Sequence, residues 1–124
     1  VEVSALAATR RVGRTGGTAG DVFETIREAY AAVGHDGEWR HHHQGGATGF
    51  AGREWFASPG DDTPVRLPMG YAWNPTVQGA KSEGTHLVTA KGVETLSATG
   101  DWPTLTVESV DGELRLDRPV PLGL

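Results

Sequence analysis

The sequence predicts an α+β domain in which two helices pack on a strongly curved antiparallel sheet. In the first third of the chain, apolar residues recur at the three- and four-residue spacing of helices. The remainder consists of short apolar runs separated by glycine, proline, asparagine and aspartate, as in strands joined by turns. The 124 residues suffice for one hydrophobic core and no linker divides them, so we expect a single domain spanning residues 1–124.

The first helix is expected to be short and to begin at the start of the chain. Apolar residues from Val1 to Val12 follow helical spacing, and Gly13 is expected to end the helix. The glycine- and threonine-rich segment at residues 14–20 has no Lys-Ser/Thr pair after its glycines, so we interpret it as a helix–helix turn rather than a phosphate-binding loop.

The second helix is predicted by apolar residues at helical spacing from Val22 to Val33. Gly34 is placed to end it in the left-handed conformation. Two alternative capping pairs could begin this helix, namely Thr18 with Asp21 or Asp21 with Glu24.

After residue 35 the pattern predicts strands and turns. Residues 59–62 and the pair Asn74-Pro75 are turn signals, and Asp111-Gly112 is a strong hairpin signal. The expected strands cover residues 38–43, 69–73, 85–90, 93–97, 105–110 and 113–116, and residues 53–56 are expected to be extended.

Composition excludes several classes of function. With 11 Lys and Arg against 16 Asp and Glu the formal charge is −5, and no basic run exists that could bind nucleic acid or an anionic membrane. No apolar stretch approaches the roughly 20 residues of a membrane-spanning helix. The absence of cysteine is compatible with the cytoplasm, which we expect as the location. Because the chain starts with Val1 and its one methionine is Met69, we expect it to be processed, or excised from a longer protein.

Three consecutive histidines, His41, His42 and His43, run into a glycine-rich segment. Imidazole both binds borderline metals and titrates near neutral pH, so one of these side chains could be a ligand or an acid–base group. The alternative is that alternate histidines of a strand point to opposite faces, one solvated and one packed on an aromatic side chain such as Trp39.

A second candidate, Glu83, precedes the apolar strand predicted at residues 85–90. It could present a carboxylate at a sheet edge. The alternative is a solvated glutamate beside Lys81, which is the usual situation of a lone acid.

Order and spacing together resemble the C-terminal half of the pita-bread metallopeptidases, which include Xaa-Pro aminopeptidases, prolidases, methionine aminopeptidases and the metal-free creatinase. The bacterial branch similar to Xaa-Pro aminopeptidases is the nearest in pattern. The resemblance covers about residues 6–121. It depends on five features in order: a helix pair around residues 11–15, His43-x-x-Gly46, Arg53-Glu54, Trp73-Asn74-Pro75 and Glu83-x-Thr85.

The resemblance implies one half of a pita-bread fold and a dinuclear Mn²⁺, Zn²⁺ or Co²⁺ centre held by two aspartates, one histidine and two glutamates. Two such metals polarise the scissile carbonyl and generate hydroxide. His43 matches the histidine ligand, with His42 as the alternative and as the catalytic candidate. Glu83 matches the last glutamate, in a Glu-Gly-Thr context where the family more often has Glu-Asp-Thr.

The remaining implied residues depart from the family. Arg53 and Glu54 lie near its second histidine region and are expected to bind substrate, but Phe50 stands where that histidine belongs. Asn74 replaces the other glutamate ligand and is assigned to substrate binding; an amide brings no charge to a cation. The aspartate pair has no counterpart, because the family takes it from a hairpin before the first helix.

Three functions follow as hypotheses. The first is the C-terminal half of a metallopeptidase that releases N-terminal residues from a peptide substrate, the chain itself being inactive. The second is a metal-free, creatinase-like C–N hydrolase with a histidine as proton shuttle. The third is a non-catalytic binding or assembly module on the same scaffold. Half of a two-lobed sheet exposes an edge, so we also expect a homodimer.

Overall fold

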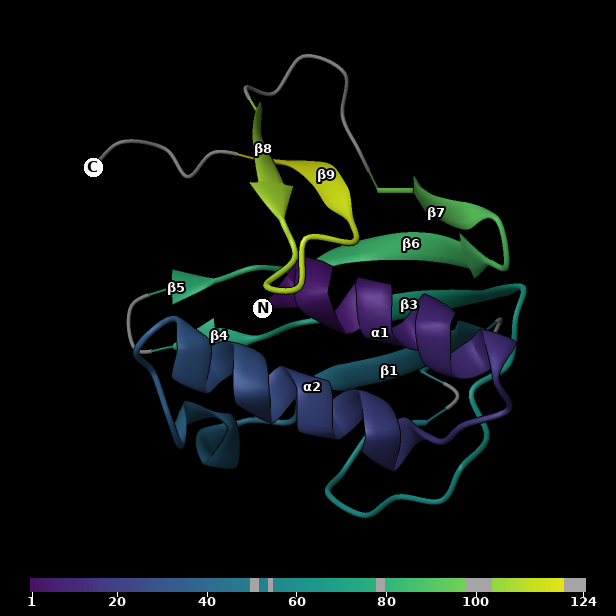
Figure 1. Ribbon diagram of the computed structural model, residues 1–124, viewed down its shortest axis with the longest axis horizontal. Helices are drawn as coiled ribbons and strands as arrows, with labels where there is room; N and C mark the ends of the chain where they lie inside the picture. The colour runs from purple at the N-terminus through teal and green to yellow at the C-terminus, as the bar shows by residue number, and fades with distance from the viewer. Residues whose placement is uncertain (50–51, 54, 78–79, 98–103, 120–124) are drawn as a thin grey trace.

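The computed structural model describes residues 1–49, 52–53, 55–77, 80–97 and 104–119. Two helices, α1 (Glu2–Arg14) and α2 (Ala19–Ala32), lie side by side over antiparallel strands, and a short 3₁₀ helix, η1 (Glu38–His41), follows α2 (Figure 1). The predicted α+β class is therefore confirmed. Within these residues, no helix is both long and apolar enough to cross a bilayer.

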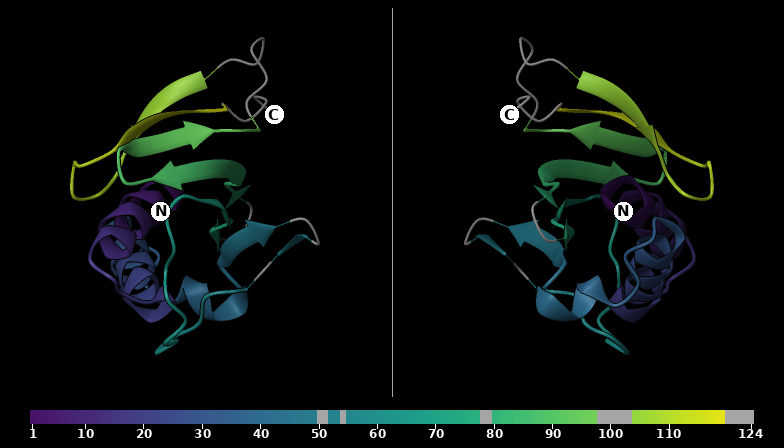
Figure 2. Two further views of the ribbon diagram at one scale, coloured as in Figure 1. Left: turned by 90° about the vertical axis from the view of Figure 1, so that its right-hand side faces the viewer. Right: turned by 90° about the vertical axis from the view of Figure 1, so that its left-hand side faces the viewer.

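The central sheet has five strands in the order β2-β1-β3-β6-β7, every neighbouring pair being antiparallel. Figure 2 shows the two helices on one side of the strands. Two further pairs, β4 with β5 and β8 with β9, form small separate sheets. The bounds are β1 Gly45–Gly49, β2 Gly52–Arg53, β3 Met69–Trp73, β4 Thr76–Val77, β5 Ala80–Lys81, β6 Gly84–Thr89, β7 Gly92–Thr95, β8 Thr104–Glu108 and β9 Arg115–Pro119.

The core lies between the helices and the sheet. In β6 every second residue is buried, namely Gly84, His86 and Val88, while the residues between them are half-buried. This is the alternation of a strand with one face toward the core. Burying an aliphatic or aromatic side chain contributes about 1.5–3 kcal/mol. The largest apolar contributions come from Leu6, Val22, Phe23, Ile26, Tyr30, Tyr71, Trp73 and Val88.

Gly13 does not end the first helix, contrary to the prediction. α1 continues to Arg14, and the left-handed residue is Gly16, with φ 77°. Gly13 instead makes room for a neighbour, because a Cβ there would lie 2.5 Å from Cγ of Leu67. The glycine therefore allows α1 to pack closely against the loop before β3 and does not terminate the helix.

The second helix is confirmed at both ends. The Thr18 hydroxyl accepts the backbone N–H of Asp21, and the Asp21 carboxylate accepts the backbone N–H of Thr18, which makes a complete capping box. Of the two open pairs, Thr18 with Asp21 is therefore the one used. Gly34 has φ 84°, as expected for the left-handed stop.

The strand predicted at residues 38–43 is wrong. Gly37, with φ 87°, leads into the 3₁₀ turn η1. The side-chain amide of Gln44 then donates to the carbonyls of Trp39 and His42, over 3.1 and 2.7 Å. Those carbonyls are thereby satisfied without a strand partner, and the strand begins only at Gly45.

The later elements are closer to expectation. β3 has the predicted bounds, and β6 and β7 differ from theirs by one or two residues. The hairpin at Asp111-Gly112 is confirmed, but its last ladder pair is Glu108 with Arg115, so the loop is longer than two residues. Several contacts tie this loop to α1, among them an ion pair of Arg11 with Glu113 over 3.6 Å. Arg11 pairs with Asp111 over 3.2 Å, and the Ser4 hydroxyl accepts the backbone N–H of Val110 over 2.9 Å.

Candidate functional site

The central sheet brings one end of β1, β3 and β6 together. β1 begins, β3 ends and β6 begins there, and Trp73 pairs with both Gly45 and Gly84. The pairing continues one residue further, because the backbone N–H of Asn74 donates to the carbonyl of Gln44 over 2.9 Å. Neighbouring strands lie about 4.8 Å apart, so the segments that flank β1 and β6 are roughly 10 Å apart.

Three predicted site residues flank this end of the sheet. His43 precedes β1 by two residues, Asn74 directly follows β3, and Glu83 directly precedes β6. The side chains of His43 and Glu83 are exposed. The His43 ring packs against Phe56, with ring centroids 4.5 Å apart. The segments that carry the imidazole and the carboxylate therefore lie at the same end of the sheet, although forty residues of sequence separate them.

Asn74 lies between these two segments and is 5 % exposed. Its side-chain oxygen is buried and has no hydrogen-bond partner among the residues that the structure describes. An unsatisfied buried acceptor costs about 1–3 kcal/mol. Such groups are rare in native proteins, and functional sites are one place where they occur.

A buried hydrogen-bond network fixes the histidine segment. The Tyr30 hydroxyl of α2 donates to Oε1 of Gln44 over 2.7 Å and accepts the backbone N–H of Thr76 over 2.8 Å. Gln44, which is fully buried, uses its amide to hold the carbonyl of His42. The second helix thus determines where the chain enters β1.

A second buried network fixes the segment before β6. Arg118 of β9 donates from Nε to Oε1 of Glu2 over 2.9 Å and from Nη2 to the carbonyl of Glu83 over 3.1 Å. The Ser82 hydroxyl donates to the same Oε1 over 2.6 Å. Glu2 and Arg118 are 2 % and 7 % exposed. Removing one member of a buried ion pair costs about 3–5 kcal/mol, because the other charge remains without compensation.

His86 completes this second network. Its Nε2 lies 3.3 Å from Oε2 of Glu2, and its Nδ1 lies 3.1 Å from the Thr95 hydroxyl. An ionised carboxylate can only accept, so Nε2 carries a proton and donates to Glu2. Burial by itself raises the pKa of Glu2, but the hydrogen bonds from His86 and Ser82 and the charge of Arg118 outweigh it. The net result is a pKa below the ordinary value of 4.5.

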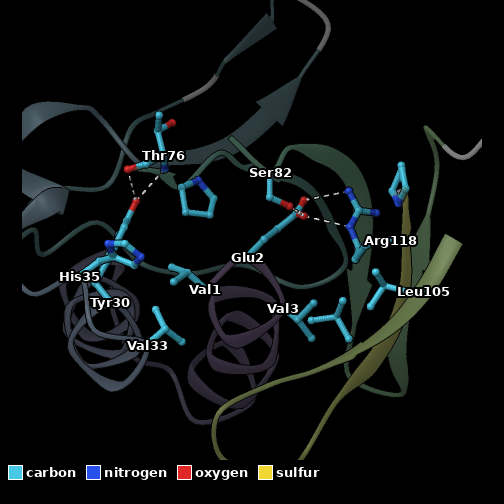
Figure 3. A pocket seen from close by; sticks show the side chains of 13 residues that line it. Val1, Glu2, Val3, Tyr30, Val33, His35, Thr76, Ser82, Leu105 and Arg118 are labelled. Atoms are coloured by element: carbon cyan, nitrogen blue, oxygen red, sulfur yellow. Dashed lines mark hydrogen bonds and ion pairs between the residues drawn. The ribbon is translucent and has the colours of Figure 1, made fainter. Parts of the chain in front are cut away.

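A cavity of about 390 Å³ opens beside both networks (Figure 3). Glu2, Ser82 and Arg118 line it from one network and Tyr30 and Thr76 from the other, and the figure shows both sets facing the same space. Its volume lies in the usual range of small-molecule sites. Apolar walls come from Val1, Val3, Val33, Leu105 and Val107.

The remaining predicted site residues are His42, Arg53 and Glu54. His42 is exposed, with its ring centroid 6.4 Å from that of His41. Arg53 lies in β2, where it pairs with Thr48, and Glu54 lies outside the described residues. The histidine that packs on an aromatic ring is His43, on Phe56, while His42 is exposed, so this part of the alternative interpretation is confirmed with a ring other than Trp39. Trp39 packs edge-on against Phe23 and lies 5.0 Å from the guanidinium groups of Arg27 and Arg40.

The sequence did not reveal the residues of the buried networks. Glu2 stood in an amphipathic helix, where an acid in the first turn is ordinary, and Arg118 lay in a stretch without a motif. The one available signal was that Glu2 sits between Val1 and Val3, both of which belong to the apolar pattern of that helix.

Imidazole and carboxylate donors suit Mn²⁺, Zn²⁺ and Co²⁺, so the chemistry of His43 and Glu83 is compatible with such an ion. However, no group of three or more His, Cys, Asp or Glu side chains able to hold a metal exists in the described part of the chain. These residues therefore do not make up a metal centre by themselves.

Comparison with known proteins adds no relationship. No family model matches the chain, and neither a curated protein nor a solved structure matches it.

Proposed function

We propose that this chain is the C-terminal half of a pita-bread hydrolase similar to the Xaa-Pro aminopeptidases, which release the N-terminal residue of a peptide. The observation that carries the proposal is the meeting of the segments with His43, Asn74 and Glu83 at one end of three neighbouring strands. The resemblance assigns ligands to these positions, and the proximity of the three strand ends supports the proposal. Aspartates from elsewhere in the protein are needed to complete the ligand set.

Each residue has a distinct role in this proposal. His43 and Glu83 contribute an imidazole and a carboxylate toward a divalent metal, Mn²⁺, Zn²⁺ or Co²⁺. His42 is the acid–base group, because its side chain is an exposed imidazole. Arg53 and Glu54 bind the peptide substrate.

Asn74 bears on the choice between a metal-dependent peptidase and a metal-free hydrolase, because it stands where the resemblance places a glutamate ligand. Its buried Oδ1 has no donor among the described residues, so it can accept an N–H group or a cation after a small rearrangement. An amide oxygen also costs less to bury than the carboxylate that the resemblance places there.

The test uses the longer protein that includes the aspartate-bearing hairpin. Mn²⁺ binding is measured by calorimetry, and release of the first residue from an Xaa-Pro peptide is measured by chromatography. We expect His43→Ala and Glu83→Gln to weaken both. The matched control is His41→Ala, which removes an exposed imidazole from η1. A longer protein that binds no divalent metal and cleaves no such peptide refutes the proposal.

A second candidate, the metal-free creatinase-like hydrolase, is favoured by Asn74, since a neutral amide replaces a carboxylate ligand. Activity that survives exhaustive chelation but is lost in His42→Ala or His43→Ala supports it.

The third candidate, a binding module, is favoured by exposed apolar side chains such as Val33 and Leu105 at the cavity. Tight peptide binding without any response to metal supports that function.

A further inference from the structure

The segment entering β6 is held by residues that are remote in sequence. Ser82 is bound by Glu2 of α1, and the carbonyl of Glu83 is bound by Arg118 of β9. Glu2 and Arg118 bind each other through two contacts, of 2.9 and 3.3 Å. One buried ion pair therefore fixes two consecutive residues, of which the second carries the proposed metal-binding carboxylate.

Gly84 shows how closely this pair approaches the strand. A Cβ on Gly84 would lie 2.6 Å from Nη2 of Arg118 and 3.0 Å from Nε2 of His86. The buried side chains thus occupy the space that a side chain at position 84 needs. This explains in physical terms why the chain has Glu-Gly-Thr here, where the pattern it resembles more often has an aspartate.

We propose that Arg118, held by Glu2, is a positioning residue that fixes Glu83 at the end of β6. The inference rests on the proposed function, because it assigns Glu83 to the site. Arginine suits this task because its planar guanidinium presents several donors in a fixed arrangement, so one group binds the carboxylate of Glu2 and the carbonyl of Glu83 together. The β8–β9 hairpin then controls the site without contributing a residue to it.

The experiment compares two double variants of the chain, labelled with ¹⁵N. Glu2→Leu with Arg118→Met removes both buried charges, a replacement that often preserves the fold because no charge is left uncompensated. Glu108→Leu with Arg115→Met is the matched control. It removes an ion pair of 3.4 Å from the same hairpin, with side chains 48 % and 71 % exposed.

The first measurement is the order of the backbone amides. In the wild-type chain and in the control, we expect order parameters of about 0.85 at Glu83 and Gly84, as for rigid backbone. In the Glu2/Arg118 variant they should fall below about 0.6 while those of α2 remain unchanged. Equal order at Glu83 in all three proteins overturns the inference.

A second variant covers the case in which the Glu2/Arg118 protein does not fold. Gly84→Ala keeps both charges but forces Nη2 of Arg118 away from the carbonyl of Glu83. The same local loss of order is expected there. Unchanged order at Glu83 in a folded Gly84→Ala protein also overturns the inference.

The second measurement separates this inference from the proposed function. Mn²⁺ is added to the longer protein that carries the aspartates of the proposed ligand set, with and without the Glu2/Arg118 substitutions, and paramagnetic broadening is followed at His43 and Glu83. We expect both residues to broaden in the wild-type protein, and the apparent affinity at Glu83 to fall 10–100-fold in the Glu2/Arg118 variant, as when groups that orient a ligand are removed. No broadening at either residue of the wild type contradicts the proposed function but leaves the order result valid. Equal broadening in wild type and variant overturns the positioning role.

Discussion

Replacing Tyr30 by phenylalanine tests the hydrogen-bond network that carries the histidine segment. The substitution keeps the ring in the core and removes a hydroxyl that has three polar neighbours. The hydroxyl donates its one proton to Oε1 of Gln44 over 2.7 Å, with the carbonyl of Thr76 3.2 Å away, and its oxygen accepts the backbone N–H of Thr76 over 2.8 Å. The fully buried Gln44 oxygen and the Thr76 N–H then lose their partner.

The expected cost follows from those two groups. A buried donor or acceptor without a partner costs about 1–3 kcal/mol. Two such groups give about 2–6 kcal/mol, and the lower end applies if water enters from the adjacent cavity, which Tyr30 and Thr76 both line. For a domain of this size, each kcal/mol lowers the melting temperature by about 3–4 °C, so the expected decrease is roughly 6–24 °C.

Urea unfolding, followed by circular dichroism, measures the change in the free energy of unfolding. Tyr71→Phe is the matched control, because within the described residues its hydroxyl bonds to the backbone N–H and carbonyl of Arg66, an exposed residue. There we expect a loss of about 1 kcal/mol. If Tyr30→Phe is no more destabilising than Tyr71→Phe, the network does not hold the segment as argued.

Two further predictions concern pH and association. The pKa of Glu2 is lower in the folded than in the unfolded chain, so the unfolded chain binds the proton first as pH falls. The contribution of Glu2 to the free energy of unfolding is therefore present above about pH 4.5 and is lost below it. Glu2→Gln should flatten this dependence in acid titrations of the free energy of unfolding, whereas Glu24→Gln, at an exposed pair with Arg27, should not. Exposed apolar residues near the cavity, such as Leu105 at 52 %, should promote a homodimer. In sedimentation velocity, Leu105→Lys should shift the chain toward monomer more than Thr106→Lys, and a wild-type chain that stays monomeric at high concentration contradicts the prediction.

The elements predicted correctly from sequence are those determined by neighbouring residues. The capping box of Thr18 and Asp21 and the left-handed Gly34 define α2 within a few residues of its ends. β3 was likewise predicted with its correct bounds, since Asn74-Pro75 ends it locally. In both cases the decisive interaction spans fewer than five positions, which a reading of the sequence can capture.

The errors arose where distant residues decide the local structure. Residues 38–43 do not form a strand because Gln44, itself held by Tyr30, binds their carbonyls. The positions of His43 and Glu83 could be anticipated only through the resemblance. The buried pair of Glu2 and Arg118 joins residues 116 positions apart, and no pattern in the sequence connects them.

The pair of Glu2 and Arg118 also has a consequence for the order of folding. During synthesis, α2 can form early, because its capping box and its left-handed stop involve only neighbouring residues. The carbonyl of Glu83 gains its partner only after the hairpin that contains Arg118 has left the ribosome. Closing a loop of this length is entropically slow. The start of β6 should therefore be among the last parts of the molecule to become rigid, and a nascent chain stalled before residue 118 should contain α2 but lack the hydrogen bond from Arg118 to the carbonyl of Glu83.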